Sequence, residues 1–146
     1  VIPEAVELAG TIRYQRPEVQ KLIHLEIERA LNVARSLGGE FELSIRTGAT
    51  PVINDARLVA LLRAVGAELL GPERVKPQEK GMGGEDFAAL AAQASGAMFR
   101  LGCRIEGDER TLHSPRFDLD ERCLPIGAAI LAEAALRLLQ HGIEDS

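Results

Sequence analysis

The chain has 146 residues, of which 46% are hydrophobic and 27% charged, and its formal net charge at pH 7 is −5. This length suggests one domain or parts of two, and the apolar content is sufficient for a packed core. No stripe of Lys and Arg is available to neutralise phosphates, so we expect no nucleic-acid partner. The sequence shows no signal peptide and no uninterrupted apolar run long enough to span a membrane. We therefore expect a cytoplasmic protein with no membrane partner.

The first fifty residues predict a strand, a helix and a second strand. Apolar and polar residues alternate over 6–14 and again over 41–46, which is typical of half-buried strands. Between them Pro17 suits the first turn of a helix, an apolar stripe runs from Val19 to Leu37, and Gly38-Gly39 ends the helix. This unit resembles half of a ferredoxin-like sandwich without its partner strands. A domain boundary is expected near residues 47–54.

The remaining residues predict further helices and short strands, and thus an α/β (α+β) fold overall. Asn54 or Asp55 can cap a helix that Gly71-Pro72 ends, with inward-facing apolar residues. An alanine-rich helix follows the glycines at 81–84, and 97–102 is expected to form a short buried strand. The last helix, 124–139, is apolar almost all round and is expected to be buried on several sides. The inward-facing residues expected on the first of these helices are Leu58, Leu61, Leu62, Val65 and Leu69.

A single histidine in a short turn is the strongest chemical signal. His113 lies in Leu112-His113-Ser114-Pro115, and histidine is the commonest protein ligand for catalytic transition metals. His24, interpreted as a helix-surface or interface residue, and His141, at a helix end, have no ligand spacing with it. A hydrogen-bonded structural role for His113 stays open. Cys103 and Cys123 show neither metal nor redox spacing and are interpreted as two reduced thiols.

A glycine-rich loop and an arginine are candidate contacts for a substrate. Gly81 to Gly84 precede Glu85 and Asp86, whose charges would repel a phosphate, and no Lys-Ser/Thr follows. The loop is thus either a tight turn or a stretch of backbone that passes close to a substrate. Arg13 is either a solvated surface charge or a guanidinium aimed at a ligand carboxylate.

Five motifs, taken in their order, resemble one family. They are Val1-Ile2-Pro3-Glu4, Gly10-Thr11-Ile12-Arg13, Gly83-Gly84-Glu85-Asp86-Phe87, Leu112-His113-Ser114-Pro115 and Leu124-Pro125-Ile126-Gly127. The chain resembles the C-terminal part of metal-dependent amidohydrolases of the aminoacylase, hippurate hydrolase and carboxypeptidase-G type. The branch of hippurate hydrolases and indoleacetyl-amino-acid hydrolases is the most similar.

The resemblance implies a two-domain enzyme. On that scheme residues 1–50 are the second half of a ferredoxin-like lid and dimerisation domain. Residues 51–146 are the C-terminal segment of a mixed-sheet catalytic domain. The intact enzyme would hold one or two divalent ions (Zn, Mn, Co or Ni) and form a homodimer through the lid.

The resemblance also implies roles for individual residues. His113 matches a metal ligand, Arg13 a contact for the substrate carboxylate, and Gly83, Gly84 and Glu85 a loop beside the substrate. No catalytic residue is expected in this chain, because the general base and the other ligands would lie upstream. The implied reaction is hydrolysis of the amide bond of an N-acyl amino acid or short peptide, and the chain alone is expected to be inactive. The alternative is a non-catalytic dimerisation or ligand-binding module.

Overall fold

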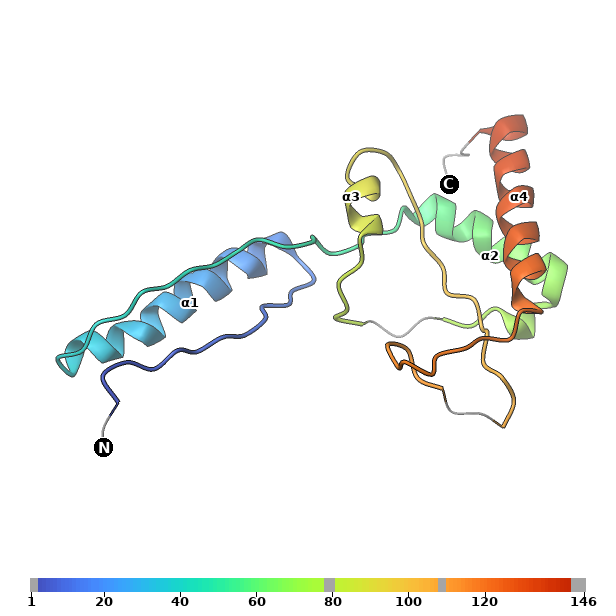
Figure 1. Cartoon of the computed structure of the whole chain (residues 1–146). Coiled ribbons are helices and arrows are strands. Elements are labelled where there is room, and N and C mark those ends of the chain that lie inside the picture. Colours follow the sequence, from blue (N-terminus) through green and yellow to red (C-terminus); the bar gives the residue numbers. More distant parts are fainter. Residues whose placement is uncertain (1–2, 78–80, 108–109, 143–146) are drawn as a thin grey trace. The chain divides into compact units, whose positions relative to one another are not determined.

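A computed structural model describes residues 3–77, 81–107 and 110–142, and the regular structure of this part of the chain is helical (Figure 1). The helices are α1 (Pro17–Ser36), α2 (Ala56–Leu70), the short 3-10 helix η1 (Pro72–Arg74), α3 (Phe87–Ala91) and α4 (Cys123–His141). The chain divides into two compact units. The first is Val1–Val52 with Lys80–Ala89, and the second is Ile53–Glu79 with Leu90–Ser146.

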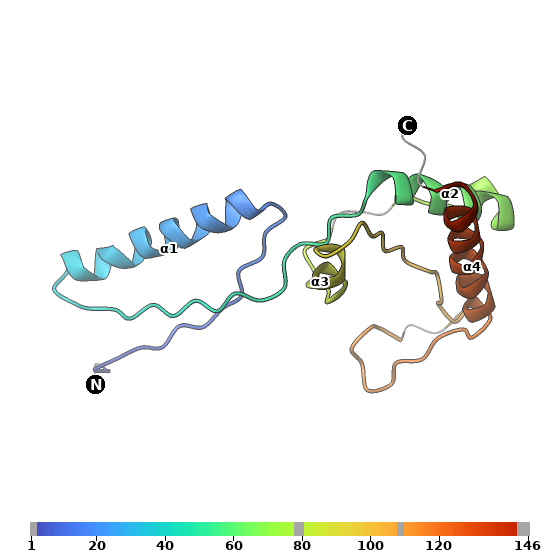
Figure 2. The same cartoon turned by 90° about the horizontal axis from the view of Figure 1, so that it is seen from above.

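The predicted α/β fold is wrong for the residues that the structure describes. No strand occurs among them, so neither the ferredoxin-like half-sandwich nor the mixed sheet is present. Figures 1 and 2 show the segments before and after α1 running alongside that helix. Alternating side chains favour an extended backbone, but a strand also needs a hydrogen-bonded neighbour. Val6 and Leu8, expected to be core residues of the first strand, are 73% and 84% exposed.

Helix α1 begins and ends where the sequence predicts. Pro17 occupies its first turn, and Gly38, with φ +85°, takes the left-handed conformation that ends it. The Gly39 N–H then donates to the Ala34 carbonyl at 2.9 Å. Beyond this end, the Arg35 guanidinium lies 4.5 Å from the centre of the Phe41 ring, which ties the returning chain to the helix.

The core of the second unit lies between α2 and α4. Its buried members are Val65, Ile130 and Ala134. Arg137 of α4 bridges the two helices by binding the Glu68 carboxylate of α2 at 2.6 Å and 3.0 Å. The partly buried residues packed against this core are Leu61, Leu62, Leu70, Phe99 and Ile126. Leu69, expected to face inward, is half exposed, and Leu70 packs in its place.

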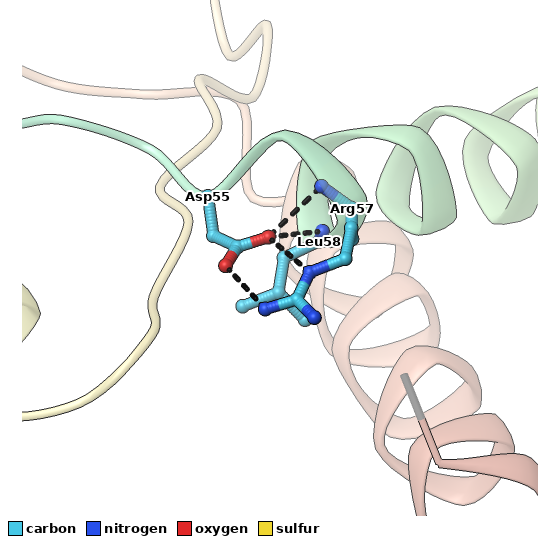
Figure 3. Close-up of polar contacts among 3 residues, drawn as sticks. All are labelled: Asp55, Arg57 and Leu58. Atoms are coloured by element: carbon cyan, nitrogen blue, oxygen red, sulfur yellow. Dashed lines mark hydrogen bonds and ion pairs between the residues drawn. The ribbon is translucent and has the colours of Figure 1, made fainter. Parts of the chain in front are cut away.

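The start of α2 is fixed by two polar residues that the sequence singles out together. The Asp55 carboxylate accepts hydrogen bonds from the backbone N–H groups of Arg57 and Leu58 and forms an ion pair with the Arg57 side chain (Figure 3). These bonds hold the pKa of Asp55 at about 2, below its ordinary 3.8. Asn54 instead exchanges two hydrogen bonds with the backbone of Met98. Asp55 is therefore the cap, and Asn54 anchors the segment near residue 98.

Helix α4 is less buried than its apolar sequence predicts. Of its described residues only Cys123, Ile130 and Ala134 are buried, whereas Leu124, Leu131, Leu136 and Leu139 are more than half exposed. By length and composition alone, α4 is also long and apolar enough to cross a membrane. A core helix that packs against another helix passes the same test, and α4 does pack against α2 through Val65, Ile130 and Ala134.

Candidate functional site

The first unit holds a cleft that brings Arg13 to the glycine-rich loop. The Arg13 Nη1 donates a hydrogen bond of 2.9 Å to the Met82 carbonyl, across 69 positions of sequence. Gly83 and Gly84 follow directly and line the same cleft, which has a volume of about 760 Å³. A guanidinium carries five N–H donors, so this one bond leaves others for a ligand. Three of the predicted substrate contacts thus lie together.

The two loop glycines are not required by the local packing of the chain. A Cβ built on Gly83 or Gly84 would meet no atom within 4 Å, and neither glycine has a left-handed φ. A side chain could therefore be accommodated at both positions in this chain. The tight-turn interpretation and the substrate-contact interpretation of the loop both stay predictions.

Glu85 lies two residues before α3 and outside the lining of the cleft. The Glu85 carbonyl accepts a hydrogen bond from the Ala88 N–H at 3.2 Å, and Glu85 is exposed to solvent. The Asp86 carbonyl likewise accepts from Ala89. Glu85 is therefore a neighbour of the loop in sequence, and its part in substrate binding stays a prediction.

One face of α1 contributes a histidine to the wall of the cleft. His24, interpreted as a helix-surface or interface residue, is half-buried and lines the cleft with Gln20, Ile27 and Leu31. These four positions follow the spacing of a single helix face. The sequence signal for this wall is the helical spacing of four, three and four residues. This spacing places the polar Gln20 and His24 on the same face of α1 as the apolar Ile27 and Leu31.

His113 belongs to the second unit and lies in a double turn. The Ser114 N–H donates to the Thr111 carbonyl at 3.2 Å, and the Phe117 N–H donates to the Ser114 carbonyl at 3.0 Å. His113 has φ +64° and is the single described residue other than glycine with a positive φ. Histidine adopts this conformation more readily than most residues, although glycine would do so with less strain. An exposed imidazole is thereby held out from the turn rather than packed in the core.

An ion pair and a backbone hydrogen bond connect the segments before and after the turn of His113. Arg110 donates to the Asp118 carboxylate at 2.9 Å, and the Asp120 N–H donates to the Cys103 carbonyl at the same distance. The guanidinium of Arg122 binds the Asp120 carboxylate and lowers its pKa. The loop that carries His113 is thus fixed at both ends.

The described residues do not form a metal site on their own. No group of three His, Cys, Asp or Glu side chains in this part of the chain is placed to hold an ion. An exposed imidazole fits the chemistry of one ligand, but tight binding needs several ligands that converge. His113 can therefore act only as one member of a set completed by other residues.

Comparison with known proteins places the chain among hydrolases. It is 37% identical over 97% of its length to a probable hydrolase, sll0100, of Synechocystis, and it covers 37% of that protein. It is 31% identical over 93% of its length to the putative amidohydrolase YhaA of Bacillus subtilis, covering 35% of it. It is 30% identical over 96% of its length to an N-acetylcysteine deacetylase of the same bacterium, covering 36% of it. The chain thus spans little more than a third of these relatives.

No solved structure matches the chain. The sequence model of peptidase family M20/M25/M40, however, matches residues 3–137, which is most of the chain. This match includes the Arg13 cleft, the glycine-rich loop and the turn of His113. The chain belongs to peptidase family M20/M25/M40.

Proposed function

We propose that the intact protein that carries this chain hydrolyses the amide bond of N-acyl amino acids or short peptides. Membership of the M20/M25/M40 family and the similarity to an amidohydrolase and an N-acetylcysteine deacetylase support this reaction class. The observation that carries the proposal is the hydrogen bond between Arg13 and the Met82 carbonyl, beside Gly83 and Gly84. This bond supports the proposal because a guanidinium, which is suited to binding a carboxylate, lies next to a loop that contains two glycines.

Arg13 is proposed to bind the carboxylate of the amino acid. Its planar guanidinium can form two parallel hydrogen bonds with a carboxylate, and its bond to Met82 limits the orientations that it can take. Gly83 and Gly84 would let the substrate approach their backbone N–H groups without a Cβ in the way. Glu85 is proposed to lie at the edge of this contact. The remaining cleft wall is partly apolar, through Ile27 and Leu31.

His113 is proposed to be one ligand of a divalent ion. The M20/M25/M40 family is generally metal-dependent, and zinc, manganese, cobalt and nickel all accept imidazole. When bound, one or two such ions supply Lewis-acid activation of an amide carbonyl and lower the pKa of a water molecule. The turn from Thr111 to Phe117 would contribute by holding the imidazole of His113 exposed and fixed in direction.

We further propose that residues 1–50 belong to a lid and dimerisation domain and residues 51–146 to the catalytic domain of a cytoplasmic homodimer. The exposed Val6 and Leu8 on an unpaired extended segment support an interaction of the first segment with another chain. The family assignment supports the proposal that residues 51–146 belong to the catalytic domain. The general base and the other metal ligands would come from outside this chain.

Steady-state kinetics on the intact protein test the role of Arg13. Arg13→Ala should lower kcat/KM for N-acetylated amino acids by roughly 10–100-fold, mainly through KM, because a charge-assisted hydrogen bond in a site contributes about 1.5–3 kcal/mol. The corresponding substrates with a C-terminal amide should be affected far less. Arg29→Ala is the matched control, since Arg29 is an exposed arginine of α1 that pairs with Glu26 on the same helix. Equal losses for acid and amide substrates would remove Arg13 from carboxylate binding.

A further inference from the structure

The second unit places its two cysteines together at the base of the loop that carries His113. Cys103 lies in the non-helical segment between α3 and α4, and Cys123 is the first residue of α4. Two backbone bonds connect these ends through Asp120. Its N–H donates to the Cys103 carbonyl at 2.9 Å, and its carbonyl accepts from the Cys123 N–H at 3.1 Å. Cys103 and Cys123 are twenty positions apart in sequence, yet both form a backbone hydrogen bond with Asp120.

The Cys103 side chain also lies near enough to Cys123 to affect its ionisation. Burial is the largest cause that raises the pKa of the Cys123 thiol, and the neighbouring Cys103 side chain is the next. Both cysteines are free thiols. The two cysteines are therefore reduced neighbours, each bonded through its backbone to Asp120, and a disulfide requires two neighbouring thiols.

The two thiols differ in access to solvent. Cys123 is 7% exposed, whereas Cys103 is partly exposed. An oxidant from solution can therefore reach Cys103 first, and Cys123 is placed to react second. This division of roles between an accessible and a resolving cysteine is typical of redox-sensitive pairs.

We propose that Cys103 and Cys123 are a dithiol pair that a small disulfide, such as oxidised glutathione, converts to an intramolecular disulfide. The Cys103 thiolate attacks one sulfur of the oxidant and forms a mixed disulfide, and the first oxidant thiol leaves. The Cys123 thiolate then attacks the Cys103 sulfur, and the second oxidant thiol leaves. The two cysteines lose two electrons and two protons, and the oxidant gains them as two thiols.

The disulfide would close the loop in which His113 lies. In the reduced chain this loop is held by the Asp120 bonds and by the ion pair between Arg110 and Asp118. A covalent bond at its base adds a restraint at the same place, so the oxidised and reduced forms differ in how firmly the loop is held. The chemistry of the pair itself does not depend on the proposed hydrolase activity.

Thiol counting and peptide mapping of the intact protein test the proposal. The protein is incubated with oxidised glutathione, its remaining thiols are alkylated, and it is denatured and cut with trypsin. Cleavage after Arg100, Arg104, Arg122 and Arg137 places Cys103 in the peptide 101–104 and Cys123 in the peptide 123–137. We expect loss of both thiols and a peptide pair joined by one disulfide, which dithiothreitol separates. Free thiols at both positions, or a disulfide between two chains, would overturn the proposal.

Two serine variants separate the roles of the cysteines. Cys123→Ser should leave glutathione bound at Cys103, because the mixed disulfide is not resolved. Cys103→Ser should slow oxidation of Cys123 by about tenfold or more, because the remaining thiol is buried and the rate depends on access. Stable glutathione on Cys103 of the unmodified protein would contradict the resolving role of Cys123, whether or not either variant folds.

Discussion

Truncation of Val65 tests whether α2 and α4 form the structural core of the second unit. Val65 is 0% exposed and packs with Ile130 and Ala134. Val65→Ala removes two buried carbon groups, worth about 0.8 kcal/mol each, and leaves a small cavity that adds to the loss. The higher helix propensity of alanine returns roughly 0.5 kcal/mol. We therefore expect the free energy of unfolding to fall by about 2 kcal/mol.

Urea denaturation followed by far-ultraviolet circular dichroism measures this loss. Leu139→Ala is the control within the same unit, because Leu139 lies in α4 and is 85% exposed. This control deletes more carbon atoms, yet it should change the free energy of unfolding by no more than about 0.5 kcal/mol. If both substitutions had the same small effect, the interface between α2 and α4 would not be the core, and the packing argument would be refuted.

Two other stability predictions follow from single residues. The folded-state pKa of Asp55 lies below its ordinary value, so its ionised form stabilises the fold at neutral pH, and this contribution is lost as the pH falls from 3.8 to about 2. Asp55→Asn keeps a cap acceptor but cannot ionise. The urea concentration at the midpoint of unfolding should therefore fall less for this variant than for the unmodified chain as the pH is lowered over that range. The same fall in both proteins would contradict this assignment. Gly71 has φ +92° at the end of α2, so Gly71→Ala should lower the free energy of unfolding by roughly 1–2 kcal/mol in urea denaturation. Gly10→Ala, where a Cβ meets nothing within 4 Å, is the control, and an equal effect at both glycines would contradict the strain argument.

The helices were predictable because their signals are local. Pro17 and Gly38 mark the ends of α1, and Asp55 and Gly71 mark those of α2, through bonds and dihedral angles within a few residues. The alternation of apolar and polar residues over 6–14 is also a local signal. It indicates which side chains share a face, but not whether the backbone has a hydrogen-bonding neighbour. Whether such a segment becomes a strand depends on a neighbour far away in sequence or in another chain. The described residues supply no such neighbour, and the predicted sheet is absent.

The candidate site was predictable in its residue types and only partly in its arrangement. Arg13 and the glycines at 83 and 84 stood out by their chemistry and by family resemblance. Their meeting through Met82 is a contact across 69 positions, which no sequence window contains. That His24 lines the same cleft as Arg13 was not visible either, because the cleft is formed by segments distant in sequence. The left-handed conformation of His113 was likewise not visible, since the pattern indicated a turn but not its dihedral angles.

Removal of His113 is the most direct test of the proposed metal-dependent hydrolase. The intact protein that carries this chain is prepared as His113→Ala and as His141→Ala, the latter a control at the exposed end of α4. Metal content per chain and hydrolysis of N-acetylcysteine are then measured on both. The account predicts that His113→Ala loses at least one equivalent of bound divalent ion and most of its activity, whereas the control retains both. Full metal content and full activity in His113→Ala would contradict the assignment of His113 as a metal ligand.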